Sequence, residues 1–228
     1  MAFKDFSSAE SCATALANDV AHSLSEVLGV RGQASLVVSG GSTPKPFFAQ
    51  LKAKKLLWEK IWITLADERW VDLNSTDSNE RMVREQLVTG GAKFVGLKNG
   101  ATTPAEGIGV AERQLATIRQ PYDVVILGMG EDGHTASLFP ETEGLAEALD
   151  LYNPHSCAAI TPPSYAPHPR ITQTLGALLN TRRLILHITG TKKRELLDEA
   201  QHPGSCLTLP VRALVQQHKV SLEVYWSP

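Results

Sequence analysis

Two kinds of hydrophobic pattern alternate along the chain. Apolar residues recur at helical spacing over 8–28, where Ser7 and Glu10 have the spacing of a capping box. Short apolar runs rich in β-branched residues follow at 34–38 and 61–66, as is typical of buried strands. The same alternation predicts a helix opening at Pro44, further helices at 77–89, 104–119, 171–179 and 191–201, and strands at 123–127, 157–160, 183–188 and 220–225.

Apolar strands that alternate with helices indicate a mostly parallel sheet covered by helices on both faces. A chain of 228 residues suits one such unit, so we expect a single-domain, Rossmann-like α/β fold over 1–228. The proline-rich segment 161–170 is interpreted as a loop rather than a domain linker.

Ligands of such sheets bind beyond the carboxyl ends of the strands. Residues suited to chemistry follow four predicted strands, at 39–43, 67–69, 128–134 and 189–193. We therefore expect these four segments to meet in one site.

Composition narrows the classes of function. The net charge of −2 gives no general electrostatic case for binding nucleic acid or an acidic membrane. Cys12, Cys157 and Cys206 are odd in number and far apart, which favours a reducing cytoplasm over a disulfide framework or a zinc site. The first residues lack the apolar core of a signal peptide, and no apolar stretch approaches the roughly 20 residues of a membrane span. We expect a cytoplasmic protein with no obligate protein partner.

The segment Gly40-Gly41-Ser42-Thr43-Pro44 has the character of a phosphate loop. Glycines let backbone N–H groups approach an anion, hydroxyls add donors, and the following helix start supplies positive potential. It lacks the GKS or GKT of a P-loop. The alternative is an ordinary strand-to-helix turn with Thr43 as N-cap.

The run Gly128–Gly133 matches GxGxxG, but Pro140 interrupts the segment before a long helix can form. No acidic residue ends a following strand at the spacing of about 20 residues that dinucleotide sites require. We interpret the run as a turn that directs Asp132 and His134 into a cleft, where the histidine can accept a proton from water. The alternative is a histidine hydrogen-bonded to its own loop.

Charged side chains stand at the other strand ends. Asp67-Glu68-Arg69 follows a strand directly, although a surface turn with a local ion pair would give the same pattern. Arg170 and Lys193 are expected at the starts of two helices, where they would strengthen an anion site or simply be solvated. The histidines show no metal-ligand spacing and there is no GxSxG, so we expect neither a metal, another cofactor nor a serine nucleophile.

Taken together, these motifs resemble those of the 6-phosphogluconolactonase family over about 8–220. The segments that carry the resemblance are SGGSTPKPFF at 39–48, ADERWVDLNSTDSNERMVRE at 66–85, DVVILGMGEDGHTASLFP at 123–140, PRITQT at 169–174 and ITGTKKREL at 188–196. The related glucosamine-6-phosphate deaminases share the strand-end Asp-Glu and Gly-x-Asp-Gly-His features. Their pattern after the histidine resembles Ile-Ala-Phe-Asn-Glu-Pro with a catalytic glutamate, whereas 135–140 here reads Thr-Ala-Ser-Leu-Phe-Pro.

The resemblance implies hydrolysis of 6-phospho-D-glucono-1,5-lactone to 6-phosphogluconate, in the oxidative pentose phosphate pathway. By resemblance His134 is the general base, and Asp132 and Asp67 orient the base or the sugar. The residues that would surround the phosphate and the ring hydroxyls are Gly40, Gly41, Ser42, Thr43, Arg69, Gly133, Arg170 and Lys193. Lys193 matches the family spacing, but the adjacent Lys192 leaves open which lysine faces the phosphate. The alternatives are a deaminase-like aldose/ketose isomerase and a non-catalytic sugar-phosphate sensor.

Overall fold

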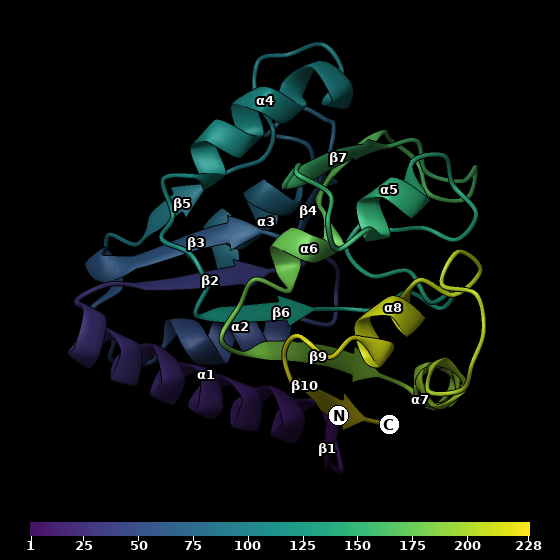
Figure 1. Cartoon of the computed structure of the whole chain (residues 1–228). Coiled ribbons are helices and arrows are strands. Elements are labelled where there is room, and N and C mark those ends of the chain that lie inside the picture. The colour runs from purple at the N-terminus through teal and green to yellow at the C-terminus, as the bar shows by residue number, and fades with distance from the viewer.

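The computed structural model describes residues 1–228 and is built on a seven-stranded sheet (Figure 1). Every neighbouring pair in this sheet is parallel, which confirms the predicted α/β class. In spatial order the strands are β1 (Ala2–Asp5), β10 (Leu222–Ser227), β9 (Leu184–Thr189), β6 (Val124–Leu127), β2 (Ala34–Val38), β3 (Ile61–Leu65) and β5 (Lys93–Val95).

The strand order changes direction between β2 and β6. From β2 the chain runs outward through β3 to β5, and then returns to place β6 on the other side of β2. Loops that leave two adjacent strands in opposite directions open a crevice at their carboxyl ends, where ligands of α/β sheets bind. The segments 39–43 and 128–134 flank this point.

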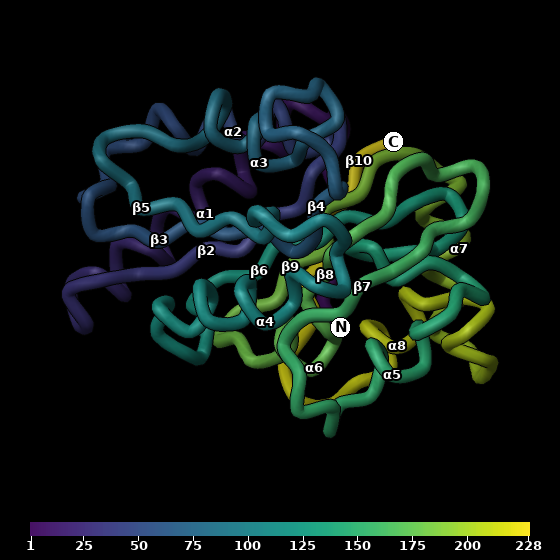
Figure 2. Tube along the Cα trace, turned by 90° about the horizontal axis from the view of Figure 1, so that it is seen from above, coloured from purple at the N-terminus to yellow at the C-terminus, as the bar shows by residue number.

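Helices cover both faces of the sheet, as predicted. On one face lie α1 (Ala9–Arg31), α2 (Lys45–Lys52) and α3 (Asn79–Gln86); the other carries α4 (Pro104–Leu115), α6 (Leu175–Leu178) and α8 (Val211–Gln216) (Figure 2). α5 (Leu145–Leu149) packs on α6, and α7 (Thr191–Ala200) packs on α8. A 3₁₀ turn at Trp58–Lys60 precedes β3. None of the helices combines the length and apolar character needed to cross a membrane.

The periodicity of apolar residues predicted α1 correctly. Its buried side chains recur every three or four residues: Cys12, Ala13, Leu16, Ala17, Val20, Leu24 and Leu28. It ends at Gly32, which adopts φ +70°. The capping box, however, joins Ser8 and Ser11 rather than Ser7 and Glu10.

A second, smaller sheet was not predicted. It contains three antiparallel strands in the order β4 (Asp67–Arg69), β8 (Arg170–Gln173) and β7 (Cys157–Ile160). The predicted helix over 171–179 is therefore wrong: 170–173 forms the central strand of this sheet, and only Leu175–Leu178 is helical. Pairing on both sides satisfies the backbone of β8, which overrides the helical spacing of its apolar residues.

Other boundaries differ by one or a few residues. Pro44 stands just before α2 rather than as its first residue. The N-cap of α3 is Ser78, whose hydroxyl accepts from the Arg81 N–H, so the helix predicted over 77–89 begins at Asn79. Sequence patterns did not predict β1, β5, α5 or α8, since each is short.

Candidate active site

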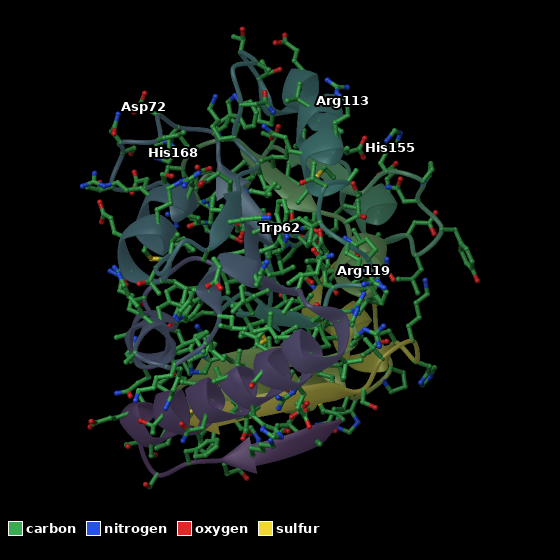
Figure 3. The ribbon with its side chains drawn as sticks, turned by 90° about the vertical axis from the view of Figure 1, so that its left-hand side faces the viewer. Trp62, Asp72, Arg113, Arg119, His155 and His168 are labelled. Carbon is green, nitrogen blue, oxygen red and sulfur yellow. The ribbon has the colours of Figure 1, made fainter.

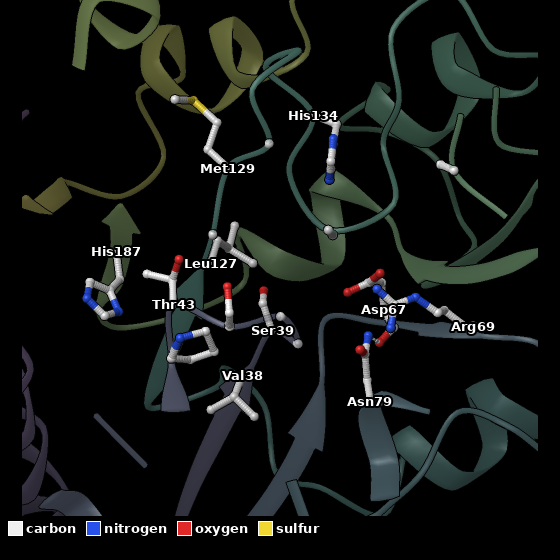
Figure 4. Close-up of a pocket in the computed structure, with 18 of the residues that line it drawn as sticks. Val38, Ser39, Thr43, Asp67, Arg69, Asn79, Leu127, Met129, His134 and His187 are labelled. Carbon is white, nitrogen blue, oxygen red and sulfur yellow. Dashed lines mark hydrogen bonds between the residues drawn. The ribbon is translucent and has the colours of Figure 1, made fainter. Parts of the chain in front are cut away.

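A cavity of about 440 Å³ opens at the carboxyl ends of β2, β3, β6 and β9 (Figure 4). The loop 161–170, which leads into β8, supplies part of its wall through Tyr165, Ala166 and Pro167. The four segments expected to meet in one site therefore do meet, at the point where the strand order changes direction.

The loop after β2 needs its two glycines for different reasons. Gly41 has φ +97°, a conformation that side chains disfavour. A side chain at Gly40 would collide with the amide of Asn79, which donates to the Asp67 carbonyl over 3.0 Å. The loop is thus packed against α3, and its Ser42 and Thr43 line the cavity.

The turn after β6 holds His134 against a carboxylate. His134 Nδ1 lies 2.6 Å from Asp132 Oδ1, and the same oxygen accepts from the His134 backbone N–H over 3.1 Å. The Tyr165 hydroxyl donates to Asp132 Oδ2 over 2.5 Å. Burial opposes ionisation of Asp132, but the hydrogen bonds from His134 and Tyr165 outweigh it and hold the pKa of Asp132 well below its usual range. Because an ionised carboxylate only accepts, the neutral imidazole carries its proton on Nδ1 and presents the lone pair on Nε2.

Two further contacts fix the imidazole. The Phe139 ring lies 4.4 Å from the His134 ring, centroid to centroid. A side chain at Gly130 would collide with both His134 and Asp132, so only glycine leaves room for the pair. His134 is therefore bonded within its own loop, as the alternative interpretation had it, and it also lines the cavity.

The segment 67–69 is not the surface turn that the alternative interpretation described. Asp67 is buried, lines the cavity and accepts from the Ser137 hydroxyl over 2.5 Å. Glu68 is fully buried and accepts from the N–H groups of Asn79 and Glu80 at the start of α3. Burial raises the pKa of Glu68 to about 7, although these N–H groups favour its charged form. Glu68 thus anchors α3, whereas Asp67 faces the ligand space.

Three cations line the cavity without an ion pair: Arg69, Arg170 and Lys193. No carboxylate lies within 4.0 Å of any of them. Burial lowers the pKa of both Arg170 and Lys193, so each charge is held partly away from water. Unpaired, partly buried positive charge is what an anionic ligand requires.

Arg69 and Arg170 lie opposite each other on the neighbouring strands β4 and β8. Arg69 pairs in register with Arg170, so Arg170 begins a strand and not the predicted helix. The Arg170 side chain donates to the backbone carbonyls of Pro167 and His168. Its position is therefore tied to the proline-rich loop.

Lys193 lies in the first turn of α7, just after the turn at Gly190. The Gly190 N–H donates to the Ser227 carbonyl over 2.9 Å, and the Gly190 carbonyl accepts from Trp226 Nε1 over 3.0 Å. The last strand thus holds the turn that presents Lys193. Lys192 is exposed and does not line the cavity.

Most predicted site residues come together. Those that line the cavity are Gly40, Gly41, Ser42, Thr43, Asp67, Arg69, His134, Arg170 and Lys193. Asp132 stands behind His134. Gly133 faces away: it has φ +78°, and a side chain there would collide with Leu209. It shapes the turn and does not line the cavity.

Sequence reasoning missed several residues of the cavity wall, namely Asn79, Met129, Phe139, Tyr165 and His187.

No group of three or more His, Cys, Asp or Glu side chains is placed to hold a metal ion. His155 and His168 lie at separate edges of the molecule (Figure 3). His168 contacts Asp77 over 3.0 Å and so ties the proline-rich loop to the loop before α3.

Comparisons with known proteins match this chain to one family over nearly its full length. A family model described as "Glucosamine-6-phosphate isomerases/6-phosphogluconolactonase" matches residues 7–226. The chain is 41% identical to a 6-phosphogluconolactonase of Rhizobium meliloti (strain 1021), over 98% of this chain and 97% of the relative. It is 37% identical to one of Pseudomonas putida, over 98% and 92% of the two chains. A crystal structure of a 6-phosphogluconolactonase from Shewanella baltica OS155 is similar with a TM-score of 0.96 and 42% identity, over 100% and 98% of the two chains.

Proposed function

The chain belongs to the family of glucosamine-6-phosphate isomerases and 6-phosphogluconolactonases, and from this premise we propose that it hydrolyses 6-phospho-D-glucono-1,5-lactone to 6-phosphogluconate. One observation carries the proposal. A histidine oriented by a carboxylate shares a cavity with three unpaired cations. This is the combination needed to activate water beside an anionic substrate.

His134 is the general base of the proposed reaction. With Nδ1–H donated to Asp132, its Nε2 accepts a proton from water as the oxygen attacks C1 of the lactone. The carbonyl becomes a tetrahedral oxyanion, which collapses by breaking the bond between C1 and the ring oxygen. The protonated His134 then returns its proton to that oxygen, and the free acid forms. Asp132 stabilises the imidazolium between these steps.

The oxyanion needs hydrogen-bond donors close to His134. Within the turn 128–133, the N–H groups of Gly130 and Gly133 already donate to backbone carbonyls. The remaining N–H groups of this turn are thus the backbone donors that we propose for the oxyanion.

The substrate phosphate supplies binding energy remote from the reacting carbonyl. We assign Lys193 and the Gly40–Thr43 loop to the phosphate. Asp67, Arg69 and Arg170, which is paired in register with Arg69, are assigned to the ring hydroxyls. Each charge-assisted hydrogen bond contributes about 1.5–3 kcal/mol. None of the three cations has to break an ion pair with a protein carboxylate before it binds the ligand. The binding energy is therefore not reduced by the loss of such a pair.

Phe139 argues against the deaminase-like alternative. The resemblance places the catalytic glutamate of the deaminases at this position, and here an apolar ring packs on His134 instead. A sensor would need the cations but not an oriented base, so the His134–Asp132 pair favours catalysis over binding alone.

The direct test is incubation with freshly prepared 6-phosphogluconolactone in a pH-stat. We expect acid release well above the spontaneous rate and no ammonium release from glucosamine 6-phosphate. A rate equal to the spontaneous one would refute the proposed activity, and ammonium release would identify a deaminase.

A further inference from the structure

His187 is a cavity residue that the proposed mechanism does not use. It lies in β9 and lines the same cavity as Lys193, yet its side chain is only 4% exposed. Its Nδ1 is shut off from solvent without any hydrogen-bond partner, and no protein group bonds its Nε2. The accessible ring nitrogen is therefore Nε2, and an unpaired N–H at this position calls for an acceptor from the ligand.

The groups around His187 leave it neutral. Burial and the charge of Lys193 lower the pKa of His187 to about 4. α2 contributes the uncharged Phe47, whose ring meets the imidazole edge-on. In β10 the residue in register is Tyr225, whose hydroxyl is bonded to Asp19. No carboxylate acts on the ring, so in the free protein it carries one N–H and no charge.

The position of His187 within the cavity indicates what that N–H meets. His187 and Thr43 lie at one end of the cavity, whereas Asp67 and Arg69 lie at the other (Figure 4). Lys193 is close enough to His187 for its charge to act on the ring. His187 therefore stands at the end that carries the hydroxyl loop and the lysine.

We propose that His187 is a further phosphate-binding residue, which donates a ring N–H to a phosphate oxygen of the ligand held by Lys193 and Thr43. The inference rests on the proposed function, because it takes the phosphate to lie at this end of the cavity. A bound phosphate dianion supplies the missing acceptor and offsets the charge of Lys193. Both effects favour the protonated ring, so binding raises the pKa of His187.

Proton NMR of the wild-type protein tests this directly. The ring signal of His187, identified by its loss in His187→Leu, is followed against pH in the free protein, with 6-phosphogluconate and with gluconate. We expect 6-phosphogluconate to raise the pKa of His187 by about one or more, and gluconate to leave it unchanged. An unchanged pKa with 6-phosphogluconate bound would overturn the assignment.

Two variants give a second readout. His187→Leu removes the donor at similar volume, and His187→Asn keeps an N–H₂. We expect His187→Leu to raise KM for the phosphorylated lactone about tenfold with kcat little changed, and His187→Asn to recover part of that loss. KM for unphosphorylated gluconolactone should not change. A packing role predicts the reverse order, with Leu tolerated and Asn harmful, and that outcome would contradict the proposal.

The failure of this inference differs from a failure of the proposed activity. If wild-type protein does not accelerate lactone opening, the activity is wrong, but the NMR comparison of 6-phosphogluconate with gluconate still decides the role of His187. If turnover is present and the His187 pKa and KM do not respond, only the inference fails.

Discussion

Replacing Lys193 by alanine tests where the substrate phosphate binds. Lys193 has no carboxylate within ion-pair distance, so its hydrogen bonds are available to a ligand. A hydrogen bond to a charged group contributes about 1.5–3 kcal/mol, and each 1.4 kcal/mol changes an equilibrium tenfold. We therefore expect Lys193→Ala to lower kcat/KM for 6-phosphogluconolactone by about 10- to 100-fold, chiefly through KM.

The thermal stability of Lys193→Ala should not fall together with its kcat/KM. Burial lowers the pKa of Lys193, which means that the folded protein disfavours its charged form. Removing the charge should leave the melting temperature unchanged or slightly higher at neutral pH, below the pKa of an unfolded lysine. Calorimetry beside the kinetic assay thus separates lost binding from lost folding.

The matched control is Lys192→Ala, one residue away on the exposed side of α7. It should leave both kinetic constants near wild type. Unphosphorylated gluconolactone provides the second control, because Lys193→Ala should barely affect its slow turnover. An equal loss on both lactones would place Lys193 near the carbonyl or in folding, and would refute the phosphate assignment.

Three other substitutions test the base and its support. His134→Asn should lower kcat/KM by about 10²–10⁴ while calorimetry still detects binding of 6-phosphogluconate; near wild-type turnover would exclude His134 as the base. Gly130→Ala should lower kcat about tenfold or more, because the new methyl group displaces His134 and Asp132, and unfolding on heating should also begin earlier. Tyr165→Phe removes the donor to Asp132 Oδ2, so we expect kcat to fall about fivefold with KM unchanged; a wild-type kcat would show that this hydrogen bond does not position the pair.

The parallel core could be predicted because its strands are buried on both faces. Such strands are continuous apolar runs, and 34–38 matches β2 to the residue. The small antiparallel sheet could be predicted only in part: 157–160 matches β7 to the residue, but 67–69 is entirely charged and 170–173 has the spacing of a helix. The pairing of β4 with β8 joins segments about one hundred residues apart, and local periodicity carries no information about such contacts.

The site residues that could be predicted are those that follow a predicted strand closely in sequence. Asp67, Lys193 and His134 all lie within seven residues after the end of a predicted strand, and all three line the cavity. Tyr165 and His187 were not found. Tyr165 reaches Asp132 across a loop whose path depends on the unpredicted β8, and His187 lies inside a strand, where its spacing resembles that of a core residue.

The two hydrogen bonds between β10 and Gly190 bear on how this protein can be engineered. Trp226 and Ser227 are nearly the last residues of the chain, and they brace a turn almost forty positions earlier in sequence. A substitution of Trp226 that removes its indole N–H would therefore loosen the presentation of Lys193, although Trp226 does not line the cavity. Engineering of β10 thus calls for a kinetic check even where the cavity wall is left unchanged.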